Sequence, residues 1–228
     1  MFLIGEVAST CVENPSGRAA KIIRALKKAI RTQSYLKRES RSSRGVFRTL
    51  IATILSARNR DESTDCATNR LFSVYRTPKE IANAPLKKIE RLIRKSGFYR
   101  TKARYVKETS RRIAVDFLGK VPESMEQLMT LPGVGRKVAG CVLVYGFGKC
   151  DCIPVDTHVH RISNRLGLVK TKAPEQTEKK LMKTVPKRLW GDVNELFVVF
   201  GQTICRPVGP KCEICPVYKY CNWLGKKL

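Results

Sequence analysis

The sequence lacks any long uncharged apolar run. None of its apolar stretches approaches the roughly 18 residues that a membrane-spanning helix requires. The apolar start, Met1-Phe2-Leu3-Ile4, ends at Gly5-Glu6, which is too short for the apolar core of a secretory signal. These two absences predict a protein that neither spans a membrane nor is exported.

Acidic residues are scarce. The 228 residues include 45 Lys and Arg but only 19 Asp and Glu, so the formal net charge is +26. Enrichment in charge for solubility or thermal stability normally raises both signs together, and here it does not. The basic residues are spread along the whole chain, which indicates a basic folded surface. We therefore expect a polyanionic partner, and this composition favours nucleic acid.

The chain also lacks strand-like alternation, convincing hairpins and internal repeats. Apolar residues in the segment 46–55 follow the spacing of one face of a helix. The segments 138–147 and 195–200 are apolar almost all round, which is typical of buried helices. The sequence therefore predicts an all-α protein. The Ser- and Arg-rich segment 38–45 is the best candidate linker, and 148–154 is the next.

A first motif, LPGVGRKVA, occupies residues 131–139. Two glycines that are two positions apart allow a sharp turn between helices, and their N–H groups then point together toward an anion. The helix that follows adds the positive end of its dipole. This pattern predicts a helix-hairpin-helix that grips the DNA backbone without reading the bases, with contacts at Gly133, Val134, Gly135 and Arg136. The alternative is an ordinary turn between helices whose apolar residues pack in the core.

Lys137 lies in the first turn after this hairpin. Arg136 beside it and the nearby helix N-terminus both disfavour an ammonium group, so we expect its pKa to fall below the usual value of about 10.4. A lysine amine with a depressed pKa is a nucleophile that can form a Schiff base. The alternative is a solvated side chain or a phosphate contact.

A second motif surrounds Asp156, which follows Pro154-Val155 and precedes a helical segment. An aspartate in this place is typical of a helix N-cap. A carboxylate held so rigidly can also stabilise a positive charge that develops on a sugar. His158 and His160 are the only histidines, and two alone do not make a metal site. We interpret both as helix-face residues, with His158 as a candidate DNA contact.

A third motif lies near the C-terminus. Nine cysteines in a chain without an export signal indicate metal or redox chemistry rather than disulfides. Four of them are closely spaced: Cys205, Cys212, Cys215 and Cys221. Four thiolates at this spacing suit either a tetrahedral zinc ion or a [4Fe–4S] cluster. The stiff basic loop between the first two presents Arg206 and Lys211 as candidate phosphate contacts.

In this order and spacing, the three motifs resemble the endonuclease III family of helix-hairpin-helix DNA glycosylases over about residues 44–223. The resemblance implies that Lys137 is the catalytic lysine and that Asp156 is the catalytic aspartate. It also implies that the four cysteines hold a [4Fe–4S] cluster, and this resemblance, not the spacing, favours iron–sulfur over zinc.

The resemblance implies a fold of two helical lobes with a DNA-binding cleft between them. A six-helix lobe with the helix-hairpin-helix would span 45–149. A discontinuous lobe with the iron–sulfur cluster would combine 1–44 and 150–228. Chemistry at a stacked nucleotide is sterically blocked, so the damaged nucleotide must turn out of the duplex.

The implied function is base excision repair by a DNA glycosylase with β-elimination lyase activity at abasic sites, acting on oxidised pyrimidines in damaged double-stranded DNA. Arg58 and Phe98 would fill the space that the everted nucleotide vacates. The family often has glutamine where Arg58 stands, which leaves the opposite-base preference open. The alternative for Phe98 is a core aromatic. We expect a monomer in the cytoplasm, associated with the nucleoid.

Three alternatives stay open. The first is a glycosylase of the same fold that is specific for mismatched uracil or thymine, or for oxidised purines. The second is a non-catalytic helix-hairpin-helix DNA-binding protein, and the third is an iron–sulfur electron carrier. Adenine glycosylases of similar sequence usually lack the lysine and carry a further C-terminal domain, whereas this chain has Lys137 and ends at Leu228.

Overall fold

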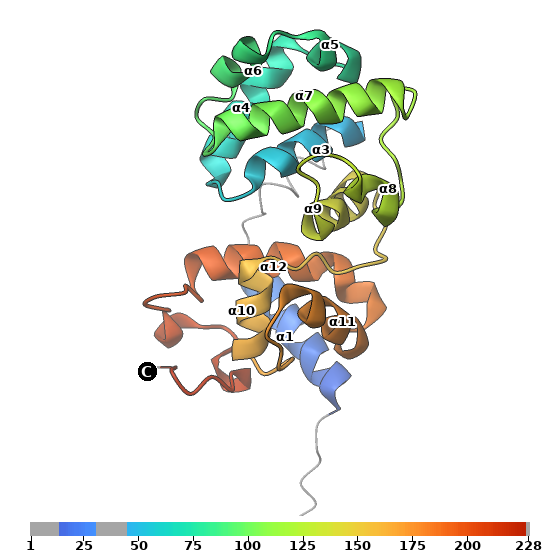
Figure 1. Ribbon diagram of the computed structural model, residues 1–228. Helices are drawn as coiled ribbons and strands as arrows, with labels where there is room; N and C mark the ends of the chain where they lie inside the picture. The colour runs from blue at the N-terminus through green and yellow to red at the C-terminus, as the bar shows by residue number, and fades with distance from the viewer. Residues whose placement is uncertain (1–13, 31–44, 227–228) are drawn as a thin grey trace, which may run out of the picture.

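The computed structural model describes residues 14–30 and 45–226. This part of the chain contains helices and no β-strand, so the prediction of an all-α protein is confirmed (Figure 1). The α-helices are α1 (Pro15–Ala29), α3 (Gly45–Ser56), α4 (Asp61–Val74), α5 (Pro78–Asn83), α6 (Leu86–Leu92), α7 (Tyr99–Val115), α8 (Met125–Met129), α9 (Arg136–Cys141), α10 (Thr157–Arg165), α11 (Pro174–Thr184) and α12 (Trp190–Thr203). A π-helix, η1 (Val142–Gly146), continues α9, and the short 3₁₀ turns are η2 (Lys187–Leu189), η3 (Cys212–Ile214) and η4 (Tyr218–Tyr220).

Helices α3 to α9 form an upper group around one apolar core (Figure 1). Helix α3 supplies Leu50, Ile51 and Leu55 to this core, each with no exposed surface. Burial of an aliphatic side chain of this size stabilises the fold by about 2 kcal/mol. Helix α3 thus buries, fully or partly, the apolar residues predicted for 46–55, and it also buries the polar residues between them, Arg48, Thr49 and Thr53. Of the two candidate linkers, the one at 38–45 lies outside the described residues except for Gly45.

Helices α1 and α10 to α12 form a lower group with a core of its own, which includes the fully buried Ile22 and Phe197. Arg18 of α1 ties this first helix to the distant C-terminal segment. Its Nη2 donates to the carbonyl oxygens of Leu166 at 2.7 Å and Tyr220 at 2.5 Å. The lower group thus combines segments from both ends of the described chain. The residue bounds expected for the two lobes stay a prediction.

The buried helices predicted for 138–147 and 195–200 are both present, as α9 with η1 and as part of α12. Close packing explains a glycine in the first of them. A Cβ on Gly146 would lie 2.9 Å from Cγ1 of Val46, so only glycine allows η1 to approach the start of α3 this closely. No helix in the described ranges is long and apolar enough to cross a membrane.

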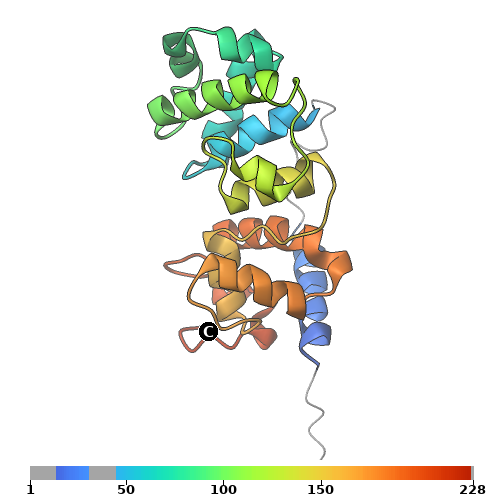
Figure 2. The same ribbon diagram turned by 45° about the vertical axis from the view of Figure 1, so that its right-hand side comes forward.

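The candidate linker 148–154 is non-helical, as the sequence predicts. It leaves η1 and runs between α9 and α12 in both views (Figures 1 and 2). Asn194 of α12 holds both this segment and η1, with one hydrogen bond to each. Its Nδ2 donates to Pro154 O at 2.9 Å, and its Oδ1 accepts from Tyr145 Oη at 3.0 Å. Because these groups are buried, each bond also satisfies a polar group that water cannot reach.

Candidate active site

A cavity of about 500 Å³ lies between the two groups of helices. Lys137 from α9 and Asp156 before α10 both line it, so two residues predicted from separate motifs share one cavity. The other lining residues come from the end of α3, the α3–α4 connection, the start of α4, the segment before α10, and α10, α11 and α12: Ser56, Ala57, Arg58, Asn59, Asp61, Val155, Thr157, His158, Pro174, Glu175, Asn194, Val198 and Gln202.

The glycine turn before α9 has the geometry that its sequence predicts. Gly133 has φ +76°, and a Cβ there would lie 2.7 Å from Cδ2 of Tyr105, so no other residue fits without strain. Gly135 is exposed and forms the N-cap of α9. Val134 is different, because its side chain is buried in the core and its N–H donates to Leu131 O at 3.1 Å.

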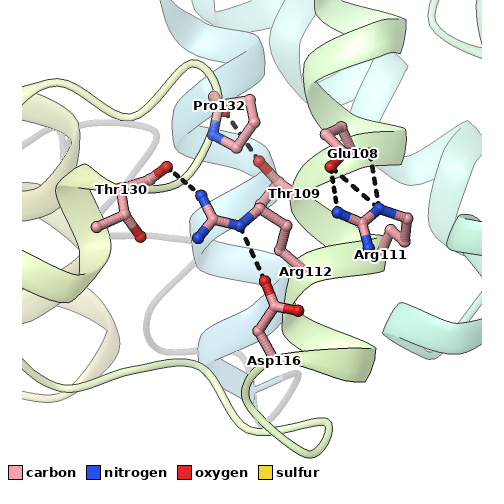
Figure 3. Close-up of polar contacts among 7 residues, drawn as sticks. All are labelled: Glu108, Thr109, Arg111, Arg112, Asp116, Thr130 and Pro132. Carbon is pink, nitrogen blue, oxygen red and sulfur yellow. Dashed lines mark hydrogen bonds and ion pairs between the residues drawn. The ribbon is translucent and has the colours of Figure 1, made fainter.

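Helix α7 holds the residues that precede this turn (Figure 3). Thr109 Oγ1 donates to Pro132 O at 2.9 Å, and Arg112 Nη1 donates to Thr130 O at 2.5 Å. Arg112 is itself oriented by an ion pair of 3.0 Å with Asp116, the C-cap residue of α7. Two side chains of one rigid helix therefore hold the carbonyl groups that lead into the glycine turn.

Arg136 connects the two groups of helices. Its Nε and Nη2 donate to the carboxylate of Glu178 in α11, at 2.6 Å and 3.1 Å. The Glu178 side chain is only 6% exposed, whereas that of Arg136 is 45% exposed. This two-point contact gives a fixed geometry as well as charge compensation. The guanidinium that the sequence marks as a DNA contact is thus already paired within the protein.

Lys137 is partly buried, and its pKa is raised above the usual value for lysine. Burial lowers the pKa, but Cys141, Asp156 and Asp61 together raise it by more. The predicted depression is therefore wrong for the free protein. The expected cause, the charge of Arg136, is compensated by Glu178, while the carboxylate of Asp156 favours the ammonium form.

Asp156 is the N-cap of α10, as its place in the sequence indicates. Its Oδ1 accepts a hydrogen bond from the N–H of Val159 at 2.9 Å. The cap fixes the side chain at the cavity wall, so the structural interpretation and a role in the cavity are compatible.

His158 lies in the same cavity, in the first turn of α10. Arg161 Nη2 donates to its Nδ1 at 3.2 Å. Burial is the main reason that the pKa of His158 is lowered. The negative charge of Asp156 raises this pKa, and the positive charge of Arg161 lowers it further. The imidazole is therefore neutral at pH 7, so it can form hydrogen bonds there but carries no charge that could neutralise a phosphate.

The two residues expected to enter the duplex lie on neighbouring exposed loops. Arg58 lines the cavity and Phe98 is 66% exposed, so the alternative of a core aromatic at Phe98 is wrong. The two loops lie side by side: Gly97 is so close to Arg58 that a Cβ on Gly97 would lie 3.6 Å from Arg58 O.

The four closely spaced cysteines surround one small cavity in the lower group. All four are free thiols, and Arg165 Nη1 donates to Cys205 Sγ at 3.6 Å. The same guanidinium donates to Arg206 O at 2.7 Å, which ties down the loop that exposes Arg206 and Lys211. No group of three or more potential ligands in the described residues could hold a single metal ion, so the thiols border a cavity rather than converge on a point.

Comparison with known proteins identifies the family. Residues 51–187 match the HhH-GPD superfamily of base excision DNA repair proteins. Endonuclease III of Thermotoga maritima is 50% identical over 181 residues, which are 79% of this chain and 84% of that protein. The chain belongs to the endonuclease III family. The predicted resemblance and the predicted class of enzyme, a DNA glycosylase/lyase of base excision repair, are confirmed.

Solved structures of endonuclease III share the fold of this family member. A trapped covalent intermediate of endonuclease III with DNA aligns with a TM-score of 0.81 at 36% identity, covering 89% of this chain and 93% of that chain. A thermostable thymine-DNA glycosylase aligns with a TM-score of 0.74 at 25% identity, covering 90% and 94%.

Sequence reasoning missed three buried polar residues near the site. Glu178 pairs with Arg136, Asn194 fixes the segment before Asp156, and Lys102 lies behind the loop of Arg58. Asn194 had a signal, because it directly precedes a stretch that is otherwise almost wholly apolar. Glu178 and Lys102 had none, since charged residues on amphipathic helices are usually solvated.

Removal of the Arg136 guanidinium should destabilise the protein. In Arg136→Met the buried Glu178 carboxylate loses its partner, and we expect the free energy of unfolding to fall by about 1–2 kcal/mol, less than for a fully buried pair because Arg136 is half-exposed. Denaturant unfolding at pH 7 measures this loss. Arg111→Met, which breaks the exposed pair with Glu108, is the matched control and should leave the free energy of unfolding almost unchanged, because water screens this pair. Equal losses in the two variants would contradict the prediction.

Proposed function

We propose that this endonuclease III family enzyme removes oxidised pyrimidines from damaged duplex DNA and then cuts the strand through a Schiff base on Lys137. The observation that supports the proposal best is the meeting of Lys137 and Asp156 at one cavity from two different groups of helices. A cavity of about 500 Å³ has the volume of ordinary small-molecule sites and is large enough for one everted nucleotide.

In the proposed reaction, the bond between C1′ and the damaged base breaks and its electron pair leaves with the base. Asp156 stabilises the positive charge that develops on the sugar. Lys137 rests as an ammonium group because its pKa is raised, so it must give up a proton before it attacks. Asp156 contributes to this raised pKa, and its carboxylate is the group suited to accept that proton and pass it toward the departing base.

The amine of Lys137 then forms a bond to C1′, and opening of the sugar ring yields the Schiff base. The positive iminium nitrogen acidifies the hydrogen on C2′. Loss of that proton and departure of the 3′ phosphate, which takes the electrons of its bond to C3′, complete the β-elimination. The strand is cut on the 3′ side, and hydrolysis of the imine returns Lys137.

The DNA contacts follow from charge and exposure. The N–H groups around Gly133 and Gly135, with the N-terminus of α9, suit a phosphate. Arg136 contributes there through its backbone, since its guanidinium is paired with Glu178. Val134 supports the turn from the core. The exposed Arg206 and Lys211 suit phosphates further along the duplex, and we propose that the enzyme acts as a monomer.

We further propose that Cys205, Cys212, Cys215 and Cys221 hold a [4Fe–4S] cluster. The chemistry of the donors fits, because four free thiols border one cavity and no disulfide consumes them. In such a cluster each cysteine binds a different iron, so the sulfurs need not converge on a single ion as in a zinc site. When bound, the cluster supplies cross-links among the C-terminal turns and stabilises the loop that carries Arg206 and Lys211.

Lys137→Gln should form no covalent adduct with DNA, because an amide cannot form a Schiff base. The measurement is borohydride trapping on duplexes that contain thymine glycol or an abasic site. Lys87→Gln, which changes an exposed lysine of α6, is the control and should trap as well as wild type. Trapping by Lys137→Gln would refute the assignment of the nucleophile.

Mismatched thymine is the second candidate substrate, since a thymine-DNA glycosylase has a similar fold. A duplex with a G·T mismatch therefore accompanies the trapping experiment. Faster adduct formation with the mismatch than with thymine glycol would favour this second candidate.

Asp156→Asn should shift the pH dependence of trapping. Asparagine keeps the helix cap but removes the negative charge that raises the pKa of Lys137, so the lysine should lose its proton at lower pH. On a preformed abasic duplex, the midpoint of the trapping rate between about pH 6 and 10 should move down. Release of a damaged base should fall by about 100-fold. Glu175→Gln, which removes a carboxylate from the same cavity, is the control and should leave the midpoint where it is in wild type. An unchanged midpoint in Asp156→Asn would exclude the coupling between Asp156 and Lys137.

Purified protein should contain iron and acid-labile sulfide in equal amounts and absorb visible light. Cys212→Ser should lose much of both, because one iron loses its thiolate. Cys66→Ser, at a free cysteine of α4, should keep the full content. A colourless protein that contains zinc would refute the cluster.

A further inference from the structure

Two neighbouring loops, the first of which lines the cavity, each contain a strained residue. Arg58 has φ 51° and Phe98 has φ 56°, and neither is a glycine. A left-handed conformation costs a non-glycine residue about 1–3 kcal/mol, and it persists only where the surrounding structure enforces it. Some interaction must therefore hold both loops in these conformations in the free protein.

Hydrogen bonds between the loops supply part of this restraint. Asn59 Oδ1 accepts from the N–H of Gly97 at 3.3 Å, and its Nδ2 donates to Ser96 Oγ at 3.3 Å. Ser96 Oγ in turn donates to Leu55 O, also at 3.3 Å. The residue after Arg58 is thus bonded to the two residues before Phe98, so neither loop can move alone.

Lys102 of α7 lies at the base of this network and is 5% exposed. Its ammonium donates to Leu55 O at 2.7 Å and to Ser96 Oγ at 2.9 Å. Leu55 is in the last turn of α3, where the carbonyl groups lack helical partners and the helix dipole is negative. One cation therefore joins the end of α3, the loop of Ser96 and the start of α7.

We infer that Lys102 is a positioning residue that locks the two loops together, so that Arg58 and Phe98 are presented to the strand opposite the everted nucleotide in one fixed arrangement. The inference rests on the proposed function together with the expectation from the sequence that these two side chains enter the duplex beside the everted nucleotide. The inference adds Lys102 as the residue that decides whether Arg58 and Phe98 enter the duplex together.

The location explains why a lysine is used there although its burial is costly. Burial lowers the pKa of Lys102 to about 8, and no carboxylate contributes. Its ammonium is held instead by two oxygen acceptors, which also satisfy a carbonyl at the end of a helix. An apolar residue of the same length would fill the space but leave Leu55 O with one hydrogen bond fewer and free Ser96 to rotate.

The test uses binding without catalysis. The duplex carries a tetrahydrofuran analogue of an abasic site, which cannot form a Schiff base, opposite 2-aminopurine. Saturating wild-type protein should raise the 2-aminopurine fluorescence several-fold, because the inserted side chains unstack the opposite base. Lys102→Met should bind about tenfold more weakly and give less than half of this rise at saturation. Lys107→Met, which removes another bond from a lysine of α7 to a carbonyl, that of Ala84, should match wild type.

Trapping at a true abasic site separates positioning from a loss of folding. With saturating duplex, Lys102→Met should trap at a rate within twofold of wild type, since Lys137 and Asp156 are unchanged. If Lys102→Met unfolds, Ser96→Ala, which keeps the lysine, should show the same loss of fluorescence.

The inference would be overturned if folded Lys102→Met gave the same fluorescence rise as wild type. If Lys102→Met unfolds, the same rise in Ser96→Ala would overturn it. It would also be overturned if the wild-type protein gave no rise. Failure of wild type to trap, with the fluorescence differences intact, would refute the proposed lyase step and leave the positioning role standing.

Discussion

The candidate active site depends on how the helix that carries Lys137 is fixed to the lower group of helices. Two contacts do this at opposite ends of α9 and η1. Arg136 pairs with the buried Glu178 at the start, and Tyr145 donates to the buried Asn194 near the end. Both contacts demand specific geometry, because each leaves a buried polar group unsatisfied if it is broken. They bring the lysine of one group and the aspartate of the other to the same cavity.

Asn194 has a second effect at this junction. By donating to Pro154 O, it holds the segment that leads into Asp156, while its carbonyl oxygen holds η1. One amide therefore links the segment before Asp156 to η1, which continues the helix of Lys137. Such a residue need not touch the reacting atoms to control their separation, since a shift of about 1 Å at a reaction centre is enough to lower a rate strongly.

The distribution of charge gives this protein two different electrostatic environments. The chain as a whole has a net charge of +26, which attracts a polyanion to its surface. Its few acidic residues are partly gathered at the cavity, where Asp61, Asp156 and Glu175 line the wall. Asp156 and Asp61 contribute, with Cys141, to the raised pKa of Lys137 in the free protein, and negative charge at the wall suits a sugar that becomes positive during reaction. Surface attraction and chemistry in the cavity thus use opposite signs of charge.

The sequence determined the helical class, the glycine turn at 133–135, the cap at Asp156 and the grouping of the four cysteines, because each depends on local periodicity, backbone freedom or short spacing. The raised pKa of Lys137 depends on the distant Asp156 and Asp61 as well as on the nearby Cys141. The pairing of Arg136 depends on the distant Glu178, and the exposure of Phe98 is a property of the packed structure. Local sequence patterns do not indicate which distant side chain will contact a given residue after folding. Only tertiary packing decided them, because electrostatic and hydrogen-bonding effects act through space between groups that folding brings together.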